Sequence, residues 1–132
     1  SSDVITCDVN QPVRDVVGIL ASKRIGALPV MRQGEVAGIF SERDVIYRMA
    51  EEGSACLDKQ VGEVMTAPAI TVERSASVDE ALSLMTRRRI RHLPVLDGGS
   101  MCGFISIGEL VKSRIEEVEQ EAASIRDYIQ TA

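Results

Sequence analysis

The residues best suited to chemistry in this sequence are a serine and an aspartate three positions apart, Ser41 and Asp44, with Arg43 between them. They follow an apolar segment, residues 36–40, that is typical of a β-strand, and they open a segment with helical character. The free N–H groups at a helix start bind phosphate, and a nearby carboxylate can accept hydrogen bonds from both hydroxyls of a ribose. Arg43 would add positive charge against the phosphate. Ser-x-x-Asp is also close to a capping box, which serves the helix itself. The spacing alone leaves both interpretations open and favours the cap.

A weaker copy of this motif follows later in the chain. Ser106 and Glu109 have the same spacing, with Gly108 where the first copy has its arginine. Ser-x-x-Glu is the ordinary capping box, so a cap is the safer interpretation for this copy.

A basic cluster, residues 87–92, holds four arginines and the only histidine of the chain. Basic residues at a helix C-terminus complement the helix dipole, which accounts for Arg87 and Arg88. Arg91 and His92 lie beyond that helix, at the start of the next strand, where they can contact a phosphate. Nucleic-acid binding is a less favoured alternative, because no aromatic residue is interleaved with the arginines.

The composition sets limits on the function. One histidine, no paired acid and base, and no metal-ligand spacing argue against an enzyme, a catalytic cofactor and a metal site. The net charge of −5 argues against a general attraction to nucleic acid or anionic membranes, and no apolar run is long enough to cross a bilayer. Cys7 and Cys102 are replaced by apolar residues in the other half of the chain. Buried free thiols and a reducing, cytoplasmic compartment are therefore expected.

All of these positions belong to an internal repeat. Residues 4–45 align with residues 69–110 without a gap. Such self-similarity indicates one structural unit used twice, and halves of about 60 residues would be marginal alone, so the two should share a core. The identical pairs are Ile5/Ile70, Thr6/Thr71, Val13/Val78, Arg24/Arg89, Ile25/Ile90, Leu28/Leu93, Pro29/Pro94, Val30/Val95, Gly34/Gly99, Gly38/Gly103 and Ser41/Ser106.

Each repeat is predicted to run strand, helix, strand, strand, helix. The proline in the strand at residues 28–31 places that strand at a sheet edge or at its own first position. A capping box at Ser77 and Glu80 opens the first helix of the second repeat. Residues 52–60 form a polar connection. The remaining predicted strands are residues 4–7, 36–40, 93–96 and 102–105.

The last helix, predicted for residues 108–129, is about twice as long as its counterpart. Its apolar residues recur at spacings of four and three, which is a heptad pattern. This seam either packs on the body of the chain or, as we favour, on a second copy, because such a helix overhangs a domain of this size. The residues of the seam are Val111, Ile115, Val118, Ala122, Ile125 and Ile129.

Together, these motifs resemble a tandem pair of CBS domains, also called a Bateman module. The resemblance rests on Ile25–Val30 with Gly38–Asp44, on Ile90–Val95 with Gly103–Glu109, and on Val64-Met65-Thr66 before the second repeat. It implies an α+β fold in which two β-α-β-β-α repeats, residues 1–58 and 59–132, pack about a pseudo-two-fold axis. The first repeat lacks a counterpart of residues 59–65, so further residues are expected upstream.

The resemblance also implies a function. Such modules are non-catalytic sensors that bind AMP, ADP, ATP, S-adenosylmethionine or NAD between the repeats, often as homodimers that act on an effector protein. A ligand-free assembly module is the alternative. In this chain the resemblance implies that Asp44 holds the ribose beside Ser41, and that Ile70, Ile90 and Arg91 surround the adenine. It also implies that Arg91 and His92 reach the phosphate. Ser106 would belong to a second cleft, where Glu109 departs from the pattern of the family.

Overall fold

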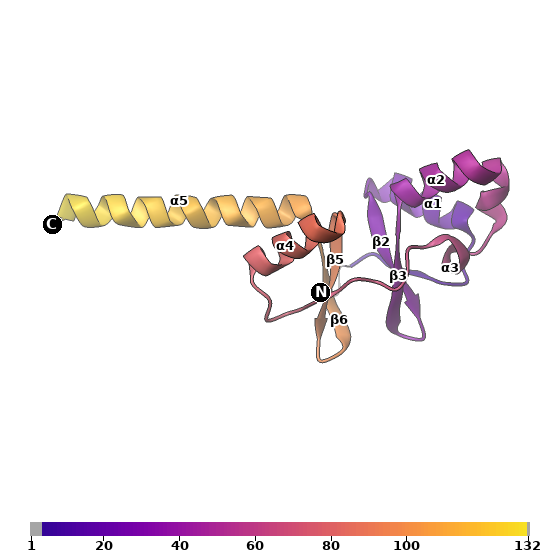
Figure 1. The fold of residues 1–132 in the computed structure, drawn as a ribbon, viewed down its shortest axis with the longest axis horizontal. Helices are drawn as coiled ribbons and strands as arrows, with labels where there is room; N and C mark the ends of the chain where they lie inside the picture. Colours follow the sequence, from indigo (N-terminus) through magenta and orange to yellow (C-terminus); the bar gives the residue numbers. More distant parts are fainter. Residues whose placement is uncertain (1–3, 132) are drawn as a thin grey trace.

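The computed structural model describes residues 4–131, and its elements repeat in the expected order (Figure 1). The first half contains β1 (Cys7–Asp8), α1 (Val13–Lys23), β2 (Ala27–Arg32), β3 (Glu35–Ser41) and α2 (Glu42–Glu52). Two short helices follow, η1 (Gly53–Asp58) and α3 (Val61–Val64). The second half contains β4 (Val72–Glu73), α4 (Val78–Arg88), β5 (His92–Asp97), β6 (Ser100–Ser106) and α5 (Ile107–Thr131).

Each half forms one three-stranded sheet, in the orders β1-β2-β3 and β4-β5-β6. In each sheet a short strand pairs parallel to the middle strand, which forms an antiparallel hairpin with the third. Cys7 pairs with Val30, and their counterparts Val72 and Val95 also pair. The α+β fold of two equivalent repeats is therefore confirmed, down to the hydrogen-bond register.

The prolines occupy an unexpected place. β2 and β5 are the middle strands of their sheets, so the expectation that the proline marks an edge strand or a strand start was wrong. The reason is that β1 is only two residues long and pairs with Val30 and Met31. At Pro29 the middle strand has a single neighbour, β3, so its missing N–H leaves no ladder bond unmade.

The first helix of each repeat ends in the same way. The residue after α1, Arg24, and the residue after α4, Arg89, both adopt the left-handed conformation with φ of 54°. This αL ending turns the chain back toward the middle strand. The capping box predicted for α4 is present, since the Glu80 N–H donates to Ser77 Oγ over 3.0 Å.

The predicted polar connection is partly buried. Cys56 of η1 is buried, and Val61 and Val64 of α3 lie in the hydrophobic core of the first repeat. Gly62 permits this contact, because a Cβ at that position would lie 3.0 Å from the Val9 carbonyl oxygen. Within the predicted connection, residues 52–60, only Cys56 is buried, and the residues that complete the first core belong to α3, directly after it.

The second core is smaller. It consists of Ala81, Met85, Leu93 and Leu110, and no helix among residues 4–131 covers it as α3 covers the first. Cys102 on β6 is only half-buried, contrary to expectation. Cys7 in the larger core is buried, and burial, with a smaller contribution from the Asp8 charge, raises its pKa to about 12.

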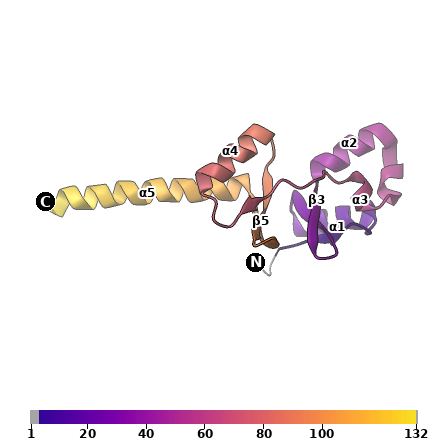
Figure 2. The same ribbon diagram turned by 60° about the horizontal axis from the view of Figure 1, so that its bottom comes forward.

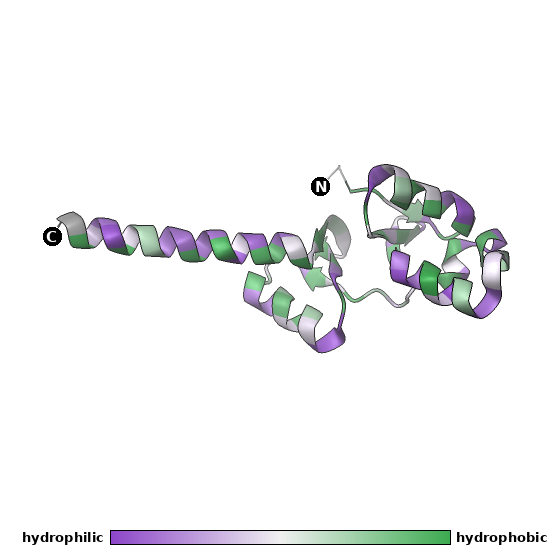
Figure 3. Ribbon diagram, turned by 90° about the horizontal axis from the view of Figure 1, so that it is seen from above, coloured by the Kyte–Doolittle hydropathy of each residue, from purple (hydrophilic) through white to green (hydrophobic). Residues whose placement is uncertain are grey.

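Helix α5 projects from the body (Figures 1 and 2). Only its first turns pack against α4, with Leu110 buried. Beyond them apolar and polar bands alternate along its length (Figure 3). The large apolar residues of the seam are between 43% and 67% exposed, so the seam does not pack on the body of the chain. Within residues 4–131, no helix has the length and the apolar character needed to cross a membrane.

Candidate functional site

The site begins where β3 ends and α2 starts. Ser41 is extended, with φ of −129° and ψ of 164°, and forms the expected capping box with Asp44. Asp44 Oδ2 accepts hydrogen bonds from the Ser41 N–H (2.9 Å) and Ser41 Oγ (3.2 Å), and the Asp44 N–H donates to Ser41 Oγ (3.3 Å). The Glu42 N–H donates to the Gly26 carbonyl over 2.9 Å. Two of the N–H groups at the helix start thus have partners, which reduces what the helix terminus can offer a phosphate.

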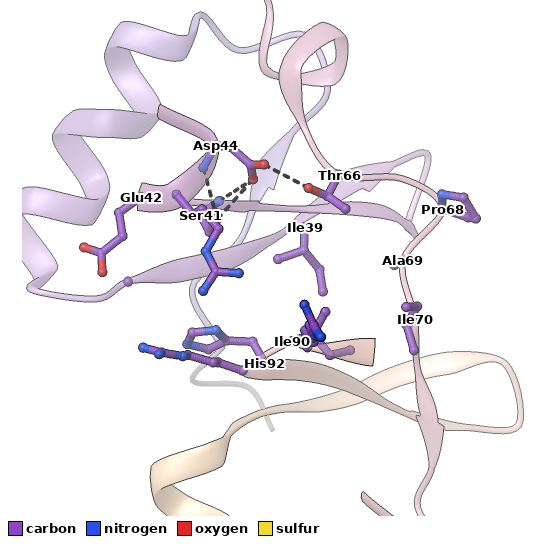
Figure 4. A pocket seen from close by; sticks show the side chains of 14 residues that line it. Ile39, Ser41, Glu42, Asp44, Thr66, Pro68, Ala69, Ile70, Ile90 and His92 are labelled. Carbon is purple, nitrogen blue, oxygen red and sulfur yellow. Dashed lines mark hydrogen bonds between the residues drawn. The ribbon is translucent and has the colours of Figure 1, made fainter. Parts of the chain in front are cut away.

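The other oxygen of Asp44 is held by a residue from outside the motif. Thr66 Oγ donates to Asp44 Oδ1 over 2.9 Å. The backbone of Thr66 also forms a two-way bridge with Ile39 of β3, with N–O distances of 2.9 and 3.0 Å. The carboxylate is therefore fixed between its own helix and the segment that leads to the second repeat (Figure 4).

A glycine makes this bridge possible. A Cβ at Gly38 would lie 2.6 Å from the Thr66 carbonyl oxygen and 2.7 Å from Met65 Sδ. Real Cβ atoms do not approach so closely, so only glycine allows the segment 65–66 to lie against β3 at this point.

Asp44 and its neighbours line a cavity of about 250 Å³ between the two repeats. In Figure 4, Ser41, Asp44 and Ile39 line one side, and His92 and Ile90 lie across from them. Apolar and polar groups both contribute, as in most small-molecule sites. The first repeat contributes Gly26, Ile39, Ser41, Glu42, Arg43 and Asp44, and the lining is completed by Thr66, Pro68, Ala69, Ile70, Arg89, Ile90, Arg91 and His92.

Charge in the lining is mixed, with an excess of cations. The lining includes three arginines, Arg43, Arg89 and Arg91, and two acidic residues, Glu42 and Asp44. Both Asp44 oxygens already accept hydrogen bonds from protein donors. The arrangement can hold an anionic group at the arginines and a hydroxyl-bearing group at the carboxylate.

His92 lies across the cavity from Asp44 (Figure 4). Its ring stacks on Phe104 with 5.5 Å between the centroids and 11° between the planes. Burial lowers the pKa of His92, and the positive charge of Arg91 lowers it further, whereas the carboxylates of Glu109 and Glu42 raise it. The net shift of the pKa is downward, which favours the neutral imidazole at pH 7.

The lowered pKa of His92 predicts a pH dependence of stability. Above about pH 6.5 the imidazole is neutral in the folded and unfolded chains alike, and as the pH falls the unfolded chain takes up the proton first. Stability is therefore lost as the pH falls below about 6.5 through the folded pKa. Thermal melts between about pH 7.5 and 5.5 should show a shallower decline for His92→Asn than for the wild type. Equal slopes would contradict this role of His92.

Most of the residues expected at the site meet in this cavity. Ser41, Arg43, Asp44, Ile70, Ile90, Arg91 and His92 all line it. Ser106 does not; it pairs with His92 across β5 and β6 and lies at the start of α5. There the Glu109 carboxylate accepts from the Ser106 N–H (3.3 Å) and Oγ (3.1 Å), so the second motif repeats the cap geometry.

Sequence reasoning missed three polar lining residues, Thr66, Arg89 and Glu42. Arg89 was the one with a signal in the sequence, because it is identical to Arg24 in the repeat and belongs to the basic cluster at residues 87–92. No signal near Ser41 and Asp44 pointed to Thr66, because its contact with Asp44 depends on the path of the chain 22 residues later.

The chain was compared with known proteins. The family model "CBS domain" matches residues 1–51 and 61–116. A solved structure of a putative signal-transduction protein with CBS domains from Burkholderia ambifaria is 45% identical with a TM-score of 0.80, over 86% of this chain and 83% of that one. The CBS domain pair of protein MJ0100, solved with 5′-methylthioadenosine and S-adenosyl-L-methionine, is 26% identical with a TM-score of 0.75, over 90% and 92% of the two chains.

A curated relative extends the comparison to a longer protein. The mitochondrial CBS domain-containing protein CBSX3 of Arabidopsis thaliana is 36% identical over 129 residues, which are 94% of this chain. The chain spans 63% of the length of that relative. With both repeats matched by the family model and the same fold in these structures, the chain belongs to the CBS domain family and carries a tandem pair of CBS domains.

Proposed function

We propose that this protein is a non-catalytic regulatory module that binds a phosphorylated adenosine ligand, of the AMP, ADP, ATP or NAD type, in the cavity between its repeats. The observation that carries the proposal is the Asp44 carboxylate, fixed on one side of the cavity, with Arg91 and His92 contributed by the other repeat. The two ligands of the related MJ0100 pair both contain adenosine, which supports this ligand class.

Each part of the ligand has a matching group. The ribose hydroxyls donate to the remaining lone pairs of Asp44 Oδ1 and of Thr66 Oγ, which itself donates to Asp44. The adenine lies among the apolar side chains of Ile39, Ile70 and Ile90. The phosphate is held chiefly by the arginines, because the N–H groups of Glu42 and Asp44 at the helix start already have partners.

The charge of the lining distinguishes between adenosine ligands. With three arginines against two acidic residues, the lining has an excess of positive charge, which attracts a phosphate and repels the positively charged sulfonium of S-adenosylmethionine. AMP should therefore bind more tightly than 5′-methylthioadenosine by about tenfold, since hydrogen bonds to charged groups contribute about 1.5–3 kcal/mol.

Calorimetric titrations with AMP, 5′-methylthioadenosine and S-adenosylmethionine test this proposal. Arg91→Gln should reduce the affinity for AMP by about tenfold and leave that for 5′-methylthioadenosine nearly unchanged. Arg88→Gln, at the last residue of α4 and outside the cavity lining, is the matched control. Equal affinities for the three ligands would contradict the phosphate site. Absence of binding by any of them would favour the alternative, an assembly module without a ligand.

The module is further proposed to act as a homodimer on an effector protein, in a reducing, cytoplasmic compartment that suits its free cysteines Cys7, Cys56 and Cys102.

A further inference from the structure

The exposed seam of α5 has the pattern of a coiled coil. In heptad notation Ile115, Ala122 and Ile129 take the a positions, and Val111, Val118 and Ile125 take the d positions. The large side chains among them are exposed along a helix that leaves the body of the chain. An apolar stripe of this length is covered in solution by a matching apolar surface.

The charges beside the seam identify what covers it. Lys112, Glu119 and Arg126 take the e positions, and Arg114 and Glu121 take g positions. In a parallel pair of helices each g residue faces the e residue of the next heptad on the other helix. Arg114 then faces Glu119 of the second copy, and Glu121 faces Arg126 of the second copy. Both pairs are attractive and occur twice.

The antiparallel alternative places like charges together. When the seam of one helix is reversed onto the other in register, e positions face e positions and g positions face g positions. Glu119 then faces Glu119, Glu121 faces Glu121, and Lys112 faces Arg126. Each of these pairs is repulsive, so the charge pattern distinguishes the two orientations.

We propose that α5 forms a parallel, in-register coiled coil with α5 of a second copy of this chain. The proposal specifies the geometry of the homodimer proposed above and is independent of ligand binding. β-branched residues at the a positions favour two strands when leucine fills the d positions, whereas β-branched residues at both favour three or four. The d positions here are Val111, Val118 and Ile125, so the sedimentation measurement below separates a dimer from a higher oligomer.

Of the two cross-helix pairs, Glu121 with Arg126 is the better one to test, because Arg114 of the other pair has ionic contacts within its own chain. Arg114 contacts Asp79 of α4 (3.5 Å) and Glu117 (3.2 Å) within its own chain. The tests below therefore use the C-terminal half of the seam.

Disulfide trapping reads the orientation directly. Ile125→Cys is introduced together with Cys102→Ser, which leaves only the buried native thiols of Cys7 and Cys56. In the parallel dimer the two introduced thiols meet at the same d layer, and mild oxidation should convert most of the protein to a covalent dimer. In the antiparallel arrangement residue 125 faces residue 115, and the two thiols lie about 15 Å apart along the axis, which is too far for a disulfide. Gln120→Cys, on the outer face of the helix, is the matched control and should run largely as a monomer on non-reducing denaturing gels.

Charge reversal supplies an independent measurement by sedimentation of otherwise unmodified protein. Glu121→Lys turns both copies of the Glu121–Arg126 pair repulsive and should weaken the dimer by about tenfold at low salt, less at high salt. Adding Arg126→Glu should restore the wild-type dimer. A monomeric wild type would overturn the proposal. A dimer that neither cross-links through position 125 nor responds to Glu121→Lys would overturn it as well, because the seam would then be antiparallel or seated on another part of the partner.

Discussion

Replacing Gly38 by alanine should destabilise the fold by about 1–3 kcal/mol, the usual range for added volume in a packed site. The new methyl group would lie 2.6 Å from the Thr66 carbonyl oxygen, in backbone that cannot move without breaking the bridge between Thr66 and Ile39. The equivalent glycine of the second repeat is the matched control. At Gly103 the nearest atom to an added methyl is Val95 Cβ at 3.8 Å, an ordinary contact, so Gly103→Ala should change stability by less than about 0.5 kcal/mol.

The same substitution should also weaken ligand binding. Displacing the segment 65–66 withdraws the Thr66 hydroxyl from Asp44 Oδ1, and the carboxylate loses one of its fixed partners. Thr66→Val removes the hydroxyl and should reproduce the loss of affinity with little loss of stability. Thr66→Ser keeps the hydroxyl and should have the affinity and the stability of the wild type. Urea unfolding of the Gly38 and Gly103 variants is the decisive comparison. Equal destabilisation at both positions would show that the close approach at Gly38 is not what makes glycine necessary.

The fold was predictable because the same local sequence patterns occur in both repeats. The apolar residues Val13, Val16, Val17 and Leu20 recur at helical spacing, and all but the half-buried Val17 are buried. The glycines and prolines recur at positions with the same register in both sheets. What could not be predicted depended on contacts between distant parts of the chain. Val61 and Val64 lie in a stretch too short to show a helical period, and only the packing against Val9 and its neighbours reveals that they complete the first core.

The candidate site likewise has local features that the sequence predicts and others that depend on contacts between distant residues. The capping geometry of Ser41 and Asp44 is local, so its spacing was sufficient to predict it. The position of Thr66 follows from the close approach at Gly38, and a glycine in a strand does not say which segment approaches it. The spacing shared by the two repeats could likewise place Arg91 and His92 at a strand start, but the burial that lowers the pKa of His92 comes from tertiary packing.

Replacing Asp44 by alanine should reduce the affinity for AMP by at least tenfold, about 1.4 kcal/mol, because the carboxylate is the acceptor proposed for the ribose hydroxyls. Asp44 also caps α2, and loss of a cap costs about 1 kcal/mol of stability, so binding must be measured well below the melting temperature of the variant. Asp44→Asn, which keeps the shape of the side chain and one acceptor oxygen, should lie between alanine and the wild type.

The second motif provides the control within the same molecule. Glu109 occupies the equivalent position, accepts the same two hydrogen bonds from its serine, and does not line the cavity. Glu109→Ala should therefore carry a similar loss of a helix cap without a loss of affinity for AMP.

The most direct test of the nucleotide site is a calorimetric titration of AMP into the wild type, Asp44→Ala and Glu109→Ala under identical conditions. The proposed site requires micromolar binding to the wild type and to Glu109→Ala, and at least tenfold weaker binding to Asp44→Ala. Unchanged affinity in Asp44→Ala, or equal losses in the two variants, would contradict the assignment of the ligand to the cavity at Asp44.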